Sequence, residues 1–119
     1  MRTSAKNVNP SLKKQITKTF IQVVADLKNL DETESFLKDF FTEKEVDAFA
    51  KRLAITYWLR KKRSYGNIKE NLKVSSATIA AGQTMMDKEG IKLALKKIEA
   101  EEWANQWAEK IRKFTKKIG

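Results

Sequence analysis

Residues 64–86 read SYGNIKENLKVSSATIAAGQTMM, and the pattern of this stretch decides the fold. It predicts two short helices, SYGNIKENL beginning at Ser64 and SATIAAGQTMM beginning at Ser75 or Ser76. The apolar positions have the spacing of a helix-turn-helix, in which two seat the first helix, one fills the turn and one packs the second helix across the first. These positions are Ile68, Leu72, Val74 and Ile79. An ordinary amphipathic helical hairpin would give a similar pattern and stays an alternative.

The rest of the 119-residue chain also has helical patterning, so we expect an all-α protein of one domain. A first helix should begin at Pro10 or Ser11 and end near residues 28–31. Asp31 is expected to cap a second helix over residues 31–41.

A third helix is predicted over residues 42–62, because Thr42 and Glu45 have the spacing of a capping box. Its basic end, Arg60 to Arg63, suits the negative end of a helix dipole. Residues 87–119 predict one long amphipathic helix, or two with a break near Glu101.

The net charge of +10 is unevenly distributed along the chain. Residues 1–20 contain basic but no acidic side chains, residues 26–47 are predominantly acidic, and residues 51–73 are basic with Glu70 as the only acid. A positive block that runs into the two-helix stretch favours binding to a polyanion, since phosphate neutralisation releases condensed counterions. A solvated lysine-rich surface would have the same composition and is the alternative.

The amino-acid composition also argues against several kinds of catalytic and metal-binding site. Cysteine and histidine are absent, which removes disulfides, thiol nucleophiles, common zinc sites and the usual proton shuttle at neutral pH. No apolar run is long enough to span a bilayer, and the first residues have no signal-peptide core. We therefore expect a cytoplasmic protein that is not an enzyme and uses no cofactor and no metal.

The region from Leu27 to Met86 resembles the Trp repressor-like superfamily, especially members whose ligand is unassigned. The resemblance is based on LKNLDETESFLKDFFTEKEVDAFAKRL, SYGNIKENL and SSATIAAG, in this order and with this spacing. It implies an intertwined homodimer and a double-stranded DNA partner, with dimerisation helices at 11–63, a helix-turn-helix at 64–86 and a helical extension at 87–119. The many aromatic rings before residue 60 fit either a monomer core or such a dimer.

The resemblance implies a DNA-binding surface around the second helix of the motif. Small polar and methyl-bearing residues would read base edges, and basic residues would contact phosphates. The expected DNA-binding residues are Lys61, Lys62, Arg63, Ser64, Tyr65, Lys69, Lys73, Ser75, Ser76, Ala77, Ala80, Gln83 and Thr84.

The resemblance also implies an effector pocket at Thr42, Arg52, Thr78 and Gly82. Tryptophan-responsive members hold the indole between two arginines; Arg52 matches the first, whereas Ala81 stands at the second. Losing that guanidinium argues against tryptophan as corepressor. A salt bridge from Arg52 to Asp47 or Glu45 is the alternative role of this arginine.

The sequence thus predicts a homodimeric transcriptional regulator, most simply a repressor, that binds DNA through a helix-turn-helix. The alternative is a basic helical module that binds RNA or a protein partner through a decayed reading helix. The C-terminal helix, with Trp103 and Trp107 on its apolar side, is expected to pack against the dimer. A partner or membrane surface is the other role open to it.

Overall fold

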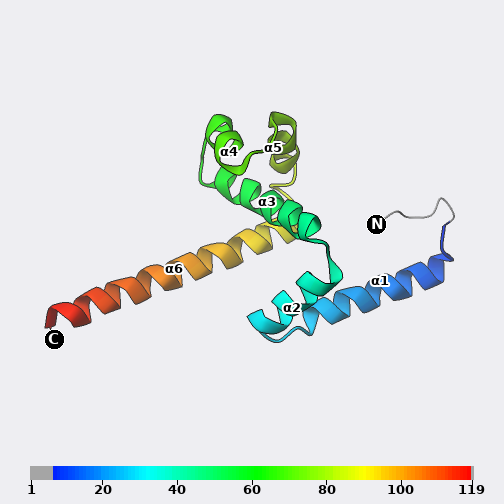
Figure 1. The fold of residues 1–119 in the computed structure, drawn as a ribbon, viewed down its shortest axis with the longest axis horizontal. Helices are drawn as coiled ribbons and strands as arrows, with labels where there is room; N and C mark the ends of the chain where they lie inside the picture. Colours follow the sequence, from blue (N-terminus) through cyan, green and yellow to red (C-terminus); the bar gives the residue numbers. More distant parts are fainter. Residues whose placement is uncertain (1–6, 119) are drawn as a thin grey trace. The chain divides into compact units, whose positions relative to one another are not determined.

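The computed structural model describes the backbone of residues 7–118 and the side chains of residues 7–102, 104, 105, 109 and 111–113. This part of the chain contains α-helices and no strand, which confirms the all-α prediction. The helices are α1 (Pro10–Ala25), α2 (Leu30–Phe40), α3 (Glu43–Arg60), α4 (Tyr65–Leu72), α5 (Ser76–Gln83) and α6 (Glu89–Ile118) (Figure 1). They form two compact units, Met1–Val46 and Asp47–Gly119, whose boundary lies within α3.

In the first unit, α1 begins at Pro10 as predicted, whereas the cap of α2 differs from the prediction. Asn9 caps α1, where its Oδ1 accepts from the backbone N–H groups of Ser11 (2.9 Å) and Leu12 (3.3 Å). Asn29, and not Asp31, caps α2, because its Oδ1 accepts from Glu32 N at 2.9 Å while Asp31 already lies in the first turn. Asparagine and aspartate are equally good caps, so composition alone did not distinguish the two positions.

The apolar side of this unit is an aromatic cluster. The rings of Phe36 and Phe40 stack at 5.0 Å between centroids, and Phe20 on α1 meets Phe40 edge to face at 5.6 Å. Neither α1 nor α2 contains a buried residue, and Phe40 is 61% exposed. The first helix is also shorter than predicted, since it ends at Ala25.

The start of α3 confirms the predicted capping box. Glu45 N donates to Thr42 Oγ1 at 3.1 Å, and Thr42 N donates to Glu45 Oε1 at 2.9 Å. The helix ends at Arg60, and Lys62 then takes a left-handed conformation with φ of 65°. The residues that were predicted as its last basic turn therefore lie mostly in the loop that leads to α4.

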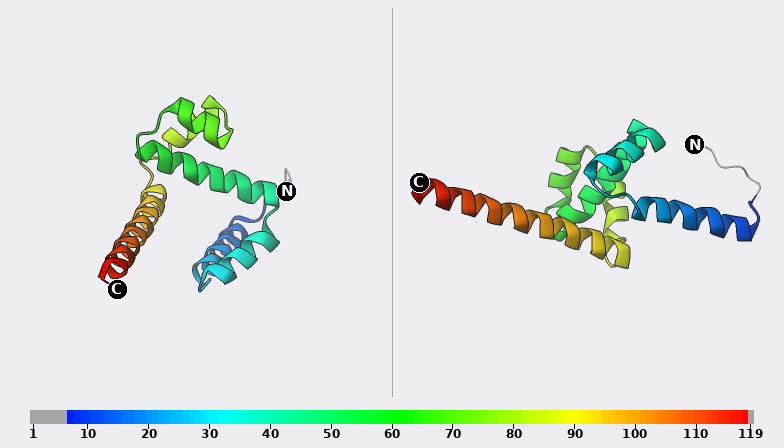
Figure 2. Two further views of the ribbon diagram at one scale, coloured as in Figure 1. Left: turned by 60° about the vertical axis from the view of Figure 1, so that its left-hand side comes forward. Right: turned by 90° about the horizontal axis from the view of Figure 1, so that it is seen from below.

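The core of the second unit lies where α3, α4 and α5 meet. Ile55, Ile68 and Ile79 are buried to 1% or less, one from each helix, and Leu72 and Val74 pack against them. Figures 1 and 2 show α4 and α5 next to each other against α3. The apolar spacing of the two-helix stretch thus predicted its packing correctly.

The C-terminal residues form one continuous helix, α6, with no break near Glu101. Leu95 on this helix is fully buried. The side chains of Trp103 and Trp107, which were expected on the apolar side, lie outside the described residues.

Candidate functional site

The turn between α4 and α5 has the geometry that a helix-turn-helix requires. Lys73 ends α4 in the left-handed region, with φ of 56° and ψ of 50°. Ser75 caps α5, since its Oγ accepts from Thr78 N at 3.1 Å, which decides between the two predicted starts. The cap and the buried Ile79 fix the orientation of α5 relative to α4.

The face of α5 opposite the core consists of short exposed side chains. At 100° per residue, the positions of Ser76, Ala77, Ala80 and Gln83 fall within one arc of the helix, and all four are exposed. The helix ends at Gln83 rather than at Met86, the predicted end. Thr84 Oγ1 donates back to Ala81 O at 2.7 Å, so this hydroxyl is already engaged.

Three other predicted DNA-binding residues carry a hydroxyl group, and two of them cap helices. Ser64 Oγ accepts from Asn67 N at 3.1 Å and caps α4, and Ser75 Oγ, besides capping α5, lies 2.9 Å from Thr78 Oγ1. Tyr65 is exposed at the first position of α4. Ser64 and Ser75 therefore stabilise the helix starts, while Tyr65 is an exposed residue without a helix-capping role.

Four exposed cations surround this motif without an ion-pair partner among the described residues. They are Lys62, Arg63, Lys69 and Lys73. The guanidinium of Arg63 lies 4.1 Å from the centroid of the Trp58 ring, and its Nη1 donates to Asn67 Oδ1 at 3.4 Å. Stacking and hydrogen bonding together restrict the orientation of this guanidinium.

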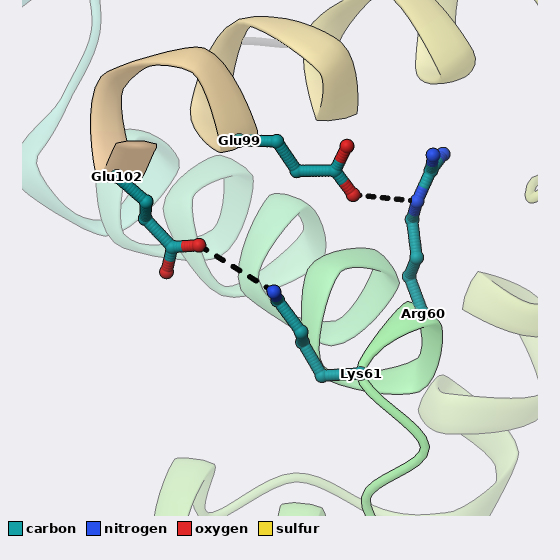
Figure 3. A network of polar contacts seen from close by, with 4 residues as sticks. All are labelled: Arg60, Lys61, Glu99 and Glu102. Atoms are coloured by element: carbon teal, nitrogen blue, oxygen red, sulfur yellow. Dashed lines mark ion pairs between the residues drawn. The ribbon is translucent and has the colours of Figure 1, made fainter. Parts of the chain in front are cut away.

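Two further cations at the end of α3 are paired with α6 (Figure 3). Arg60 Nε lies 2.8 Å from Glu99 Oε1, and Lys61 Nζ lies 3.6 Å from Glu102 Oε2. The phenol of Tyr57 and the Glu102 carboxylate raise the pKa of Lys61. Lys61, one of the predicted phosphate contacts, thus has a carboxylate partner, unlike Lys62 and Arg63.

A pocket of about 450 Å³ lies between α3 and α5. It includes Arg52, Thr78 and Gly82 from the predicted effector site, together with Ala81, but not Thr42, which is engaged in the α3 capping box. The full lining is Ala48, Lys51, Arg52, Ile55, Val74, Ala77, Thr78, Ala81, Gly82 and Met85.

Several residues that shape this region were not identified from the sequence as functional. Trp58 and Asn67 hold Arg63, Glu99 and Glu102 pair with the end of α3, and Met85 lines the pocket. The four-residue spacing of Arg63 and Asn67 could have indicated their contact. Arg63 lies before the start of α4, however, so the spacing rule for residues within one helix did not apply directly. The contacts with α6 had no local signal because they join distant parts of the sequence.

The described residues lack two kinds of feature. They contain no group of three Asp or Glu side chains placed to hold a metal ion. Nor do they include a helix with the length and apolarity needed to cross a membrane.

Comparison with known proteins agrees with this geometry. Residues 15–99 match the family described as Trp repressor protein, so the part of α6 after residue 99 lies outside the match. A solved structure, described as a TrpR-like protein from Eubacterium eligens ATCC 27750, superposes with a TM-score of 0.69 at 28% sequence identity. The match covers 76% of this chain and 96% of that chain, whereas no curated protein matches. The chain therefore belongs to the Trp repressor family.

Proposed function

We propose that this protein is a homodimeric transcriptional regulator that binds double-stranded DNA through α4 and α5. In this proposal, residues 11–63 form the dimer, residues 64–86 bind DNA and residues 87–119 extend the fold. Family membership supports the general role. The exposed side chains of the motif support the choice of site residues.

One observation carries the proposal: a short polar helix face is bordered by cations that no carboxylate neutralises among the described residues. Ser76, Ala80 and Gln83 are short enough for close approach to base edges, and Gln83 can pair with adenine through two hydrogen bonds. Lys69 and Lys73 lie at the end of α4 and in the turn, where they would contact phosphates. Arg63, held on Trp58, would add a phosphate contact of fixed orientation.

The exposed apolar side of the first unit supports a homodimer. Leu12, Ile16 and Phe20 on α1 are exposed, and Leu30 at the start of α2 is 85% exposed. Apolar surface of this extent on a small domain is typical of an interface. A second copy is the occupant that the family relationship favours, and twofold symmetry would then place two α5 helices in successive major grooves about 34–36 Å apart.

The test begins with selection of bound fragments from genomic DNA, followed by footprinting of the enriched site and measurement of the molar mass by sedimentation equilibrium. We expect a twofold-symmetric footprint and the mass of a dimer. Affinity should fall steeply between about 50 and 200 mM salt.

Lysine variants distinguish the effect of a direct phosphate contact on DNA affinity from the effect of net charge. Lys69→Ala and Lys73→Ala should each weaken binding about equally on all sequences and reduce the salt slope by about 1. Lys38→Ala is the matched control, because Lys38 Nζ already pairs with Glu34 at 2.8 Å on α2. Binding that is independent of salt, or a footprint without symmetry, would contradict the proposal, as would tighter binding to duplex RNA.

A further inference from the structure

The first half of α6 has an apolar face that is used inside the second unit. Successive residues of an α-helix are about 100° apart around the helix axis, so each position has a defined direction. The described residues of α6 that are buried or half-buried all fall within one arc of about 140°. They are Ile91, Ala94, Leu95, Ile98, Glu99 and Glu102. Glu99 and Glu102 pair with Arg60 and Lys61 at the end of α3, so this face of α6 is occupied (Figure 3).

The apolar residues of the second half of α6 fall on the other side of the helix. They stand at Trp103, Trp107, Ile111, Phe114 and Ile118. These five positions, which we call the second face, lie within an arc of about 80° whose centre is about 150° from that of the occupied face. The described residues on this side of α6 are exposed, among them Leu93 (56%), Ile111 (58%), Ala100 and Ala104. The second face therefore does not continue the packing against α3.

Basic residues accompany the second face. Residues 103–118 contain five lysines and arginines but only one acid, Glu109. The basic residues are Lys110, Arg112, Lys113, Lys116 and Lys117. Glu109 pairs with Arg112, so the excess positive charge is that of the lysines. All five basic positions lie outside the arc of the second face, and the segment is thus a basic amphipathic helix.

An anionic lipid surface matches both sides of such a helix. Aromatic and aliphatic side chains enter the boundary between headgroups and acyl chains, while lysines meet the headgroup phosphates. DNA would neutralise the lysines but would leave the apolar side in water. Of these two polyanions, only the bilayer also removes the second face from water.

A second copy of α6 is a poorer partner for the second face. In an antiparallel pair, each flank of one helix meets the same flank of the other, so the flank with Lys110, Lys113 and Lys117 would meet itself. In a parallel pair, that flank would meet the one with Ala104 and Ala108, which has no counter-charge. Neither pairing gives the lysines the ion pairs that usually flank a helix–helix seam.

We propose that residues 103–118 of α6 bind the surface of an anionic phospholipid bilayer, with the second face in the interface and the lysines at lipid phosphates. The helix lies on the bilayer and does not cross it. This surface is separate from α4 and α5, and the proposal does not rest on the proposed function.

The experiment measures flotation of the full chain with two kinds of vesicle. One is phosphatidylcholine alone, and the other is phosphatidylcholine mixed with phosphatidylglycerol. We expect binding to the mixed vesicles at least about tenfold stronger than to the neutral ones, and weaker at high salt. Tryptophan emission should shift to the blue with the mixed vesicles, and Trp103→Phe with Trp107→Phe should abolish the shift.

Variants at one exposed position test the apolar contribution. Ile111→Gln should weaken binding to the mixed vesicles about tenfold, because the isoleucine no longer leaves water. Ile111→Leu is the matched control, since it keeps the apolar area, and should change binding by less than about twofold. Circular dichroism of both variants checks that the helix is retained.

A pair of double variants tests the charge. Lys113→Gln with Lys116→Gln should weaken binding to the mixed vesicles about tenfold or more. Lys69→Gln with Lys73→Gln removes the same charge from α4 and the turn after it, and should change vesicle binding by less than about threefold. An equal loss in both double variants would overturn the proposal, because vesicle binding would then follow net charge.

Three further outcomes would also overturn it. They are absence of binding to the mixed vesicles, equal binding to both kinds of vesicle, and unchanged binding of Ile111→Gln. A lower molar mass of Ile111→Gln in sedimentation equilibrium without lipid would assign the second face to a second copy instead. A protein that binds duplex DNA but no vesicles would reject this proposal and leave the proposed function standing, and vesicle binding without DNA binding would do the reverse.

Discussion

Gly82 on α5 lies so close to Ile55 on α3 that a Cβ atom added to it would be 2.6 Å from Cγ2 of the isoleucine. Real Cβ atoms essentially never approach so closely, so a larger residue requires the helix or the side chain to move. Both residues are buried, and Ile55 belongs to the core that also contains Ile68 and Ile79. This contact fixes the distance between α5 and α3.

Gly82→Ala should therefore lower the free energy of unfolding by about 1–3 kcal/mol, despite the better helix propensity of alanine. Thermal and urea unfolding measure this change. Gly66→Ala is the matched control, because a Cβ at Gly66 on α4 meets nothing within 4 Å. That variant should be neutral or more stable by up to about 1 kcal/mol.

In an Ile55→Ala background the loss of unfolding free energy caused by Gly82→Ala should nearly vanish. An unchanged loss would show that the Ile55 contact is not its cause.

The ion pairs between α3 and α6 should limit the positive charge available to DNA. Glu102→Gln frees Lys61, and we expect tighter DNA binding with a salt slope steeper by about 1. Fluorescence anisotropy with a labelled duplex at several salt concentrations measures both quantities. The folded state should change little, since exposed ion pairs contribute about 0–1 kcal/mol.

Glu109→Gln is the control for this prediction, because Glu109 pairs with Arg112 within α6 itself. The two variants remove the same charge from the same helix. An equal gain in affinity from both would mean that net charge, rather than release of Lys61, explains the effect.

Gln83 should determine which sequences are preferred more than how tightly DNA is bound. Gln83→Ala removes an exposed amide from α5 and should reduce affinity for the preferred site by about 1–3 kcal/mol. Binding to unrelated duplexes should stay nearly constant. Parallel selection experiments with the original protein and the variant would show this, and an equal loss on every sequence would exclude Gln83 as a base-reading residue.

L-Tryptophan at about 1 mM should leave DNA binding unchanged. The pocket offers Arg52 on α3, but Ala81 on α5 supplies neither charge nor a stacking plane for an indole. Ala81→Arg should restore part of a tryptophan response, as measured by calorimetry and by DNA affinity with and without the amino acid. Micromolar binding of tryptophan to the original protein, with a parallel gain in DNA affinity, would contradict this prediction.

The capping box of α3 should make its first turn sensitive to acid. Hydrogen bonding from Thr42, chiefly from its backbone N–H, holds the pKa of Glu45 below its usual value of 4.5. Because the folded-state pKa is depressed, this stabilisation is fully present above pH 4.5 and is lost as the pH falls through the lowered value. Glu45→Gln should therefore lower the Tm at neutral pH, and the difference from the original protein should shrink in acid.

Thermal unfolding followed by circular dichroism between neutral pH and about pH 2 tests this dependence. Glu43→Gln is the control, because Glu43 occupies the same turn but makes no hydrogen bond to the helix end within the described part of the chain. A constant difference in Tm between Glu45→Gln and the original protein at every pH would refute the assigned role of the carboxylate.

Local interactions explain what could be predicted from the sequence. The Thr42–Glu45 capping box and the Ser64 cap involve residues three apart, so their hydrogen bonds depend only on nearby backbone geometry. The spacing of Ile68, Val74 and Ile79 likewise indicated the packing of α4 and α5, because helical periodicity determines which residues share a face. The caps at Asn9 and Asn29 were missed because neighbouring polar residues have similar local preferences.

The sequence by itself determined the helices, the starts of α3 and α4 and the apolar face of the two-helix motif, since these depend on residues within one or two turns of one another. Only the tertiary structure decided that Gly82 must be small against Ile55. It also decided that Lys61 is paired with Glu102, whereas Arg63 lies on the Trp58 ring. Finally, it placed Arg52 at a pocket without a carboxylate partner among the described residues. Most of these relationships join side chains from different helices, and the stack of Arg63 on Trp58 needs the left-handed turn at Lys62. Their distances depend on how the chain packs as a whole, which no local pattern encodes.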